Sequence, residues 1–367
     1  MNQPGSFHPV SSTASVLWDH LSGDGTSGNI VFSPFGIYLL LAALNEGASG
    51  KTAEVLAAFL GIVSPESIRA EAARYFTFPS RRTSESILTL ANLFLIKDTF
   101  NVSENFLKTI RDYYRFYAER SAFDSAALTR INQWASENTD GRINEVLRAL
   151  TPDEVMLLVN SILFTGQWET PFQSGATRPG KFTNLDGTVS EAKMMFLRGE
   201  MEYYHGAEYS AVRLKYTGGR FSMIFLLPEA NAPGGEVFSP ALREGIPFPK
   251  GGSFGELRAP RIGLSNEINV DAILKKAGLA NLFSPDADLT GINPDGRLNA
   301  NRIIQRNSLT VDEAGTIAAS VTAAAVAFRG MNPRKPDFSM TCDRTYYLLL
   351  SDELFGVPLI AARVGEI

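Results

Sequence analysis

The sequence predicts an α+β protein that folds as one unit. Helical and strand-like segments intermix along all 367 residues. No internal repeat, heptad run or Pro/Gly/Ser linker divides the chain. The composition, 44% hydrophobic and 20% charged, is that of a soluble globular protein with a sizeable core. We therefore expect a single domain over residues 1–367.

The N-terminal part predicts a helix followed by a short strand. Ser11 and Ser12 are suited to cap a helix. Its apolar positions would be Val16, Leu17 and Leu21. Residues 23–28 are rich in glycine and predict a turn, and the apolar residues of 29–32 predict a strand.

A buried helix is expected next. Ser33 provides a capping hydroxyl, and Pro34 fits the first helical position because its missing N–H has no partner there. Residues 39–44 are apolar on every side, which is typical of a central helix. Gly47 is the expected end.

Four further elements can be read from periodicity. Apolar residues recur at helical spacing from Leu128 to Trp134, and an uninterrupted apolar run precedes Phe164, as in strands buried on both faces. The expected elements are an amphipathic helix that includes residues 128–138 and ends near Gly141, a strand over 155–164, a strand over 221–227 and a helix over 270–278.

Charge and cysteine content exclude several function classes. The net charge is -5 with no long basic run, which gives no reason to expect a nucleic-acid partner. Arg81 and Arg82 are too short a cluster to predict a polyanion cofactor site. Cys342 is the single cysteine, so the fold needs no oxidising compartment.

The cellular location is predicted from the first ten residues and from the hydropathy of the chain. Residues 1–10 contain no basic residue and no apolar run of signal length, and no stretch is long enough to span a membrane. These observations predict a cytoplasmic protein without a membrane partner. Secretion through a removed leader or an unconventional route stays open.

Several motifs resemble catalytic or cofactor sites but lack the required context. Residues 23–28 match G-x-G-x-x-G, yet a predicted helix precedes them and a strand follows, the reverse of a dinucleotide site. Residues 50–52 end like a phosphate loop, but Asn45 stands where its first glycine belongs. Asp286 begins like a calcium loop, but the twelfth position is Arg297.

The three histidines are His8, His20 and His205. Their spacing from one another and from Cys342 is not that of metal ligands. A Ser/His/Asp triad assembled in space is not excluded by spacing, but no nucleophile-elbow signature supports one. We expect no cofactor, no metal and no enzymatic activity.

Residues 309–336 form the most unusual segment. Residues 316–327 are uncharged and almost all small. As a strand, this run would present one face without any large or charged side chain, which suits a crowded place between two strands. The face consists of Thr316, Ala318, Ser320, Thr322, Ala324 and Val326. Polar and proline-bearing residues 328–336 follow directly and predict an exposed loop.

Together with several other segments, this run resembles the serpin family, and the resemblance extends over almost the whole chain. The segments at 29–34 and 47–52 resemble its first conserved block, and 132–143 is similar to its sixth helix. Residues 159–168 resemble the strand with the shutter asparagine and the breach tryptophan, and 312–316 resembles the hinge. The resemblance implies a metastable fold of three β-sheets and about eight to nine helices, with an exposed reactive-centre loop at about 314–336.

The resemblance also implies roles for particular residues. Counting sixteen residues from Glu313 places the cleaved bond between Arg329 and Gly330. Its specificity neighbours would be Phe328, Ala327 and Met331. The hinge would comprise Glu313, Ala314, Gly315, Thr316, Ala318, Ser320 and Thr322. The shutter and breach would comprise Ser33, Asn160, Gln305 and Trp168.

Some positions depart from the family pattern. Gln305 stands where the family usually has a histidine, which keeps hydrogen bonding but removes a titratable group. Ile317 replaces a usual glutamate, but it lies on the opposite face of the run from Thr316. Ala314 replaces a common charged residue, and Thr345 replaces a usual proline.

The implied function is suicide-substrate inhibition of proteases by a monomeric protein. Cleavage would let the loop insert into the main sheet as a new strand, starting at Thr316, and would trap the acyl-enzyme. Arg329 suits trypsin-like serine proteases, and Phe328 beside it also suits papain-like cysteine proteases. The alternatives are a non-inhibitory carrier or chaperone with the same fold and, less compatible with the histidine content, an enzyme.

Overall fold

The computed structural model describes residues 9–23, 28–77, 86–138, 141, 143–151, 154–230, 237–296, 298–300, 302–316 and 334–367. The helices are α1 (Pro9–Gly23), α2 (Pro34–Asn45), α3 (Gly50–Leu60), α4 (Pro65–Thr77), α5 (Glu104–Tyr114), α6 (Ser125–Asn138), α7 (Phe238–Glu244) and α8 (Val270–Leu274). Short 3₁₀ or π turns cover Ser174–Ala176, Lys275–Leu279 and Ala280–Phe283.

The strands are β1 (Ile30–Phe32), β2 (Ser86–Lys97), β3 (Phe116–Ser121), β4 (Met156–Gln167), β5 (Arg178–Thr183), β6 (Val189–His205), β7 (Tyr209–Lys215), β8 (Phe221–Pro228), β9 (Ser253–Pro260), β10 (Ile262–Asn269), β11 (Arg302–Val311), β12 (Gly315–Thr316), β13 (Phe338–Thr341), β14 (Tyr346–Asp352) and β15 (Val357–Val364). Strands and helices follow one another irregularly along the chain, so the α+β class is confirmed.

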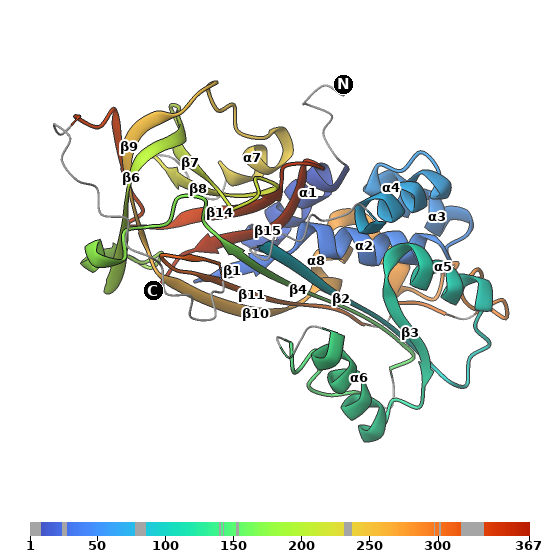
Figure 1. Ribbon diagram of the computed structural model, residues 1–367. Coiled ribbons are helices and arrows are strands. Elements are labelled where there is room, and N and C mark those ends of the chain that lie inside the picture. The colour runs from blue at the N-terminus through green and yellow to red at the C-terminus, as the bar shows by residue number, and fades with distance from the viewer. Residues whose placement is uncertain are drawn as a thin grey trace.

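A six-stranded sheet has the order β10-β11-β12-β4-β2-β3 (Figure 1). Its centre is β4, whose first nine residues are all buried. The predicted strand over 155–164 is therefore confirmed, and it extends to Gln167. β4 pairs antiparallel with β2 on one side and parallel with β11 on the other.

A nine-stranded sheet follows the path β1-β15-β14-β8-β7-β6-β9-β13, with β5 added to β6. The 17-residue β6 joins two parts of this sheet, because its first part pairs with β5 and β9 and its last four residues pair with β7. One part of this sheet contains β1, β15, β14, β8 and β7, and the other contains β5, β9 and β13, with β6 shared between them. With the six-stranded sheet, these two parts make the three sheets that the family resemblance implies.

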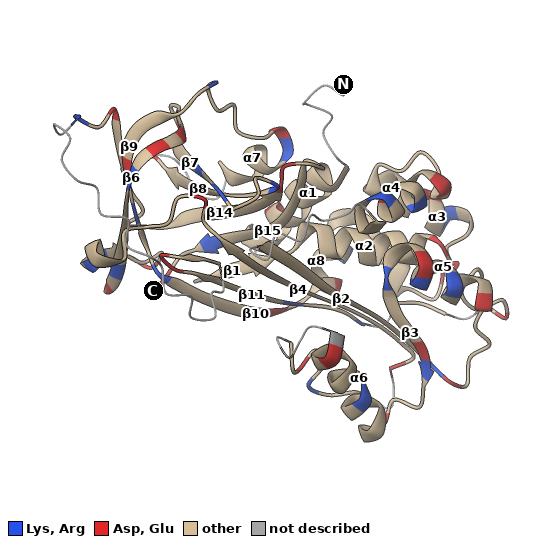
Figure 2. Ribbon diagram, viewed as in Figure 1, with Lys and Arg blue, Asp and Glu red and all other residues tan. Residues whose placement is uncertain are grey.

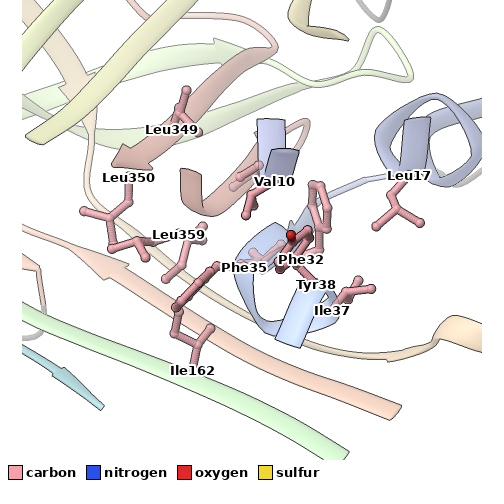
Figure 3. Packing of buried hydrophobic residues seen from close by; sticks show 14 of the residues in the cluster. Val10, Leu17, Phe32, Phe35, Ile37, Tyr38, Ile162, Leu349, Leu350 and Leu359 are labelled. Carbon is pink, nitrogen blue, oxygen red and sulfur yellow. The ribbon is translucent and has the colours of Figure 1, made fainter. Parts of the chain in front are cut away.

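The main hydrophobic core lies between the sheets around α2. Ser33 caps this helix by accepting a hydrogen bond from Gly36 N at 3.0 Å, with Pro34 following, as predicted. Every residue of α2 is buried. Figure 3 shows Phe35 of α2 between Leu359 of β15 and Ile162 of β4. Apolar residues on every side of α2 are needed because strands and helices surround it.

A second core forms on the opposite face of the six-stranded sheet, under α6 (Figure 1). Ile131 and Ala135 of α6 pack there against side chains of β2, β4 and β11. The contributing strand residues are Leu93, Leu95, Leu157, Val159 and Ile304. The predicted amphipathic helix is confirmed, and its described residues run from Ser125 to Asn138.

Two predicted helix boundaries differ from the structure. The first helix begins at Pro9, before the two serines, because proline is compatible with the first turn of a helix. The helix expected over 270–278 is regular only to Leu274 and continues as a π turn. Gly278 in that turn has a φ of 97°, a left-handed conformation that ends the regular helix.

The described residues carry mixed charges. Lys and Arg lie among Asp and Glu on α5 and on the helices beside it (Figure 2). Within these residues, no group of His, Cys, Asp and Glu is arranged to hold a metal ion. None of the helices built from them has the length and apolar character to cross a lipid bilayer. Cys342 is a free, fully buried thiol.

Candidate functional site

The six-stranded sheet is opened at one end by two residues. β4 and β11 lie side by side in parallel register from Leu157 and Arg302 up to the pair of Ile162 with Asn307. Beyond that pair the two strands separate, and β12 occupies the space between them. Thr316 pairs with Val311 of β11 on one side and with Gly166 of β4 on the other. The chain that follows Thr316 therefore starts inside the sheet.

The fit of β12 depends on a glycine. A Cβ atom at Gly315 would lie 1.9 Å from the carbonyl oxygen of Gly166, so no larger residue fits without moving the strand. Thr316 is 1% exposed. The expectation that Thr316 enters the sheet only after cleavage is wrong, because this residue already pairs with both neighbouring strands.

Aromatic side chains hold the inserted residues in place. The rings of Trp168 and Tyr216 are stacked with centroids 4.3 Å apart. The Tyr216 hydroxyl is 2.5 Å from Thr316 Oγ1, a hydrogen bond in which either oxygen can donate. Trp168 donates its Nε1–H to the carbonyl of Asp312 at 3.0 Å and its backbone N–H to Ala314 at 2.9 Å. Trp168 therefore lies directly beside the two inserted residues.

Glu313 fastens the start of the hinge to the neighbouring sheet. Its carboxylate accepts hydrogen bonds from Arg261 Nε at 2.6 Å and from the Thr177 hydroxyl. Its backbone carbonyl accepts from Phe172 N at 2.9 Å. Burial favours the neutral acid, but the hydrogen bonds from Arg261 and Thr177 outweigh it and lower the pKa of Glu313 below its ordinary value of 4.5.

Glu313→Gln is expected to reduce the unfolding free energy at pH 7 by about 1–3 kcal/mol, because it removes the charge that Arg261 pairs with. A lowered carboxylate pKa stabilises the fold above the unfolded value and loses that effect as the pH falls through the folded value. The gap in urea midpoint between wild type and variant should therefore shrink from pH 7 towards pH 3.5. The exposed Glu169→Gln is the matched control. A gap that does not change with pH would contradict the assignment.

The shutter is a buried network centred on Gln305, which is 0% exposed. Its Nε2 donates to the carbonyl of Ser33 at 2.8 Å and to Asn160 Oδ1 at 2.9 Å. Its Oε1 accepts from Ser33 N at 2.8 Å and from Asn307 Nδ2 at 3.2 Å. The glutamine amide therefore joins β11, β4 and the start of α2 without any titratable group.

Close backbone packing completes this network. A Cβ at Gly36 of α2 would lie 1.9 Å from Asn160 Oδ1, so the helix approaches β4 only because this residue is glycine. Asn160 Nδ2 donates in turn to Asn92 Oδ1 of β2 at 2.8 Å. The residues that the sequence assigns to the shutter are therefore brought together.

After residue 316, the next residue that the structure describes is Arg334. Its guanidinium contacts Glu200 Oε1 and Asp337 Oδ2, each at 2.9 Å, and lies 4.9 Å from the centre of the Phe254 ring. Its carbonyl accepts from Arg198 Nη2 at 2.6 Å. Arg334 is thus fixed to β6 and β9, just before β13.

Eight predicted site residues lie outside the described residues. Three belong to the hinge, Ala318, Ser320 and Thr322. The other five are the predicted cleavage bond and its neighbours: Ala327, Phe328, Arg329, Gly330 and Met331.

Sequence reasoning missed three partners of the hinge. Tyr216 follows β7, Arg261 joins β9 to β10, and Thr177 precedes β5. Each is at least 50 residues from the group it binds. No local pattern marks them, because their residue types become functional only where distant strands meet.

Comparison with known proteins agrees with this architecture. The family model described as Serpin (serine protease inhibitor) matches residues 10–367. Ipis-1 from Ixodes persulcatus is 29% identical over 94% of both chains, and human neuroserpin is 24% identical over 95% of this chain and 88% of its own. Corticosteroid-binding globulin from Saimiri sciureus is 27% identical over 95% and 87%.

Solved structures share the fold. Serpin48 of the insect Tenebrio molitor has a TM-score of 0.84 at 24% identity, covering 98% of this chain and 97% of its own. Arabidopsis AtSerpin1, in a conformation described as native and stressed, has a TM-score of 0.86 at 23% identity with 98% of both chains covered. An open sheet with a seated hinge, together with these matches, defines the class: the chain belongs to the serpin family, whose members are mostly protease inhibitors.

Proposed function

We propose that this serpin is a suicide-substrate inhibitor of trypsin-like serine proteases, cleaved between Arg329 and Gly330. The observation that carries the proposal is the position of β12. Gly315 and Thr316 already lie between β11 and β4, and the next eleven residues are uncharged and nearly all small. A strand made of this run has no large or charged side chain to exclude from the sheet.

The mechanism follows from that continuity. A protease attacks the carbonyl of Arg329, the Gly330 amine leaves, and the acyl-enzyme remains attached to the freed end of the run. The run then extends β12 between β11 and β4, and the direct pairing of these strands over 157–162 and 302–307 separates to admit it. About a dozen residues of strand span on the order of 40 Å, enough to carry a bound protease far from where it docked. Distortion of the acyl-enzyme stops its hydrolysis.

Arg329 is favoured as the bait by its distance from Glu313 and by the state of the other nearby arginine. Arg334 is held in ion pairs with Glu200 and Asp337, so it is poorly placed to enter a specificity pocket. An arginine bait suits the acidic pocket of trypsin-like enzymes. With Phe328 beside it, papain-like cysteine proteases form a second target class.

A non-inhibitory binding protein of the same fold is the alternative. One relative, corticosteroid-binding globulin, bears a binding function in its name. The small, uncharged residues after Thr316 favour an inhibitor, since bulky or charged residues there would oppose insertion. A carrier would be cleaved in the loop without forming a stable complex.

Mixing the protein with trypsin is expected to give an SDS-resistant complex of summed mass and a released fragment that begins at Gly330. Arg329→Glu is expected to abolish the complex without lowering the thermal midpoint. Lys335→Glu makes the same charge change at an exposed position and serves as the matched control. Cleavage without a complex would support the carrier, and a complex cut after another residue would overturn the choice of Arg329.

A further inference from the structure

The segment that joins α6 to β4 crosses the line along which the sheet would open. We call residues 143–151 the connector, and the side-by-side pairing of β4 residues 157–162 with β11 residues 302–307 the seam. Val146 and Leu147 of the connector are buried in the cluster under α6. That cluster includes Val159 of β4 and Ile304 of β11, so the connector covers both strands.

The connector is fixed to the β4 side of the seam. Asn132 of α6 accepts hydrogen bonds from the backbone N–H groups of Val146 at 2.8 Å and Leu147 at 2.9 Å. It also donates to the carbonyl of Leu147 at 2.7 Å. Four residues, 152–155, separate the connector from the start of β4, and the connector is therefore expected to move with α6 and β4.

Two arginines of β11 reach across the seam to this segment. Arg306 donates to the carbonyl of Glu145 at 2.5 Å and pairs with its carboxylate at 3.3 Å. Arg302 pairs with Glu154, just before β4, at 2.9 Å. The two arginines are four residues apart on one strand, so they share the face of β11 that carries Ile304.

These contacts are partly shielded from water. Each pair has one partner that is mostly buried, Arg306 at 13% and Glu154 at 10% exposed, and one that is more exposed, Glu145 at 55% and Arg302 at 28%. Neighbouring strands lie about 4.8 Å apart, so a strand inserted at the seam would move β11 away from β4 by about that distance. The bonds of 2.5–3.3 Å that join Arg302 and Arg306 to the β4 side would then be broken.

We propose that Arg306, bound to Glu145 of the connector, and Arg302, bound to Glu154 just before β4, hold the seam closed and set the rate at which the sheet opens. The ion pairs of Arg302 and Arg306 hold β4 and β11 together at the shutter, while β12 already lies between these strands at the breach. The inference rests on the proposed function only for the identity of the incoming strand, because opening of the seam can be measured without a protease.

One ion pair provides an internal control. Arg306 also binds Glu267 of β10, with Nη2 at 2.7 Å and Nε at 2.8 Å from the same carboxylate oxygen. Glu267 is the register partner of Arg306 in the β10–β11 pair. It lies on the same side of the seam, so this contact is kept when the seam opens.

Hydrogen exchange followed by mass spectrometry tests the proposal on peptides that contain residues 157–162 and 302–307. Glu154→Gln is expected to increase seam exchange about three- to ten-fold, the range for a partly buried, hydrogen-bonded ion pair, and Glu145→Gln about two- to five-fold, because the Glu145 carboxylate is 55% exposed. The double variant is expected to exceed either, and Glu267→Gln is expected to stay within about two-fold of wild type. Unchanged exchange in β14 and β15 would show that each variant is folded.

Wild-type exchange in both cross-seam variants would overturn the proposal. An equal increase with Glu267→Gln would also overturn it, since any lost charge would then have the same effect. The two proposals fail separately. If the wild type forms no protease complex but the Glu145 and Glu154 variants show faster seam exchange, the inhibitor proposal fails and the role of the two arginines stands. If the wild type forms the complex but the variants show unchanged exchange, the role of the arginines fails and the inhibitor proposal stands.

Discussion

Protein cleaved after Arg329 is expected to unfold at a far higher temperature than the intact chain. In the native sheet β4 and β11 pair with each other only up to Asn307. Completing β12 would replace the direct pairing of these two strands over 157–162 and 302–307 by backbone hydrogen bonds from the new strand to both facing edges, a net gain because two edges are then paired with it. Some ten bonds of about 0.5–1.5 kcal/mol each give on the order of 10 kcal/mol. Differential scanning calorimetry of intact and cleaved protein measures the difference.

Thr316→Arg is expected to remove most of that gain and to convert the inhibitor into a substrate. Thr316 is buried and hydrogen-bonded to Tyr216. An arginine there would bury an unpaired charge at a cost of several kcal/mol, which displaces the hinge from the sheet and delays its return. The acyl-enzyme then hydrolyses before insertion.

Ala314→Arg is the matched control, because this half-buried residue two positions earlier lies outside β12. It is expected to retain most of the inhibition. Complex formation by Thr316→Arg at wild-type stoichiometry would show that trapping does not depend on insertion through this residue.

Gln305→Leu is expected to produce the largest loss of native stability among shutter variants. It removes four buried hydrogen bonds and leaves Ser33 N and Asn160 Oδ1 without this partner. Unmet buried groups cost about 1–3 kcal/mol each, so the unfolding free energy should fall by about 3–6 kcal/mol. Urea denaturation measures this loss. A change below about 1 kcal/mol would mean that the network contributes little.

Gln305→His separates the hydrogen bonds from the chemistry of titration. A neutral imidazole can replace part of the network, but a buried histidine must gain a charge at low pH. Its folded pKa would lie below the unfolded value of about 6.5, so stability would be present above that pH and lost as the pH falls below it. Wild type lacks this group and is expected to show no such loss at the shutter between pH 7 and pH 5.5.

Much of the fold was predictable because its elements carry local signals. The cap at Ser33 with Pro34 marks α2, and continuous apolar runs mark β4 and β8. Such patterns follow from burial on all sides and need no knowledge of neighbours. Boundaries were less certain, as at α1, because proline and serine are both acceptable in a first helical turn.

The site was predictable only in part. The family resemblance singles out Trp168, Asn160 and Gln305. In the structure Gln305 donates to Asn160, and Trp168 donates to the carbonyl of Asp312 beside the hinge. The number of residues already inserted was not predictable, because it depends on the space left between two strands whose paired residues are 145 apart in sequence. The ion pairs of Arg302 and Arg306 across the seam were not predictable either, because nothing in the local sequence distinguishes these two residues from other charged residues on a strand.

The sequence by itself determined the class of fold, the small-residue run that can become a strand, and the spacing that places Arg329 after Glu313. These features are local, since residue size, charge and count are fixed by the chain. Tertiary structure alone decided that Thr316 is already inside the sheet, that Tyr216 and Arg261 hold the hinge, and that the seam is crossed by ion pairs. Those features depend on which distant backbones lie within hydrogen-bond distance, and only packing of the whole chain sets that distance.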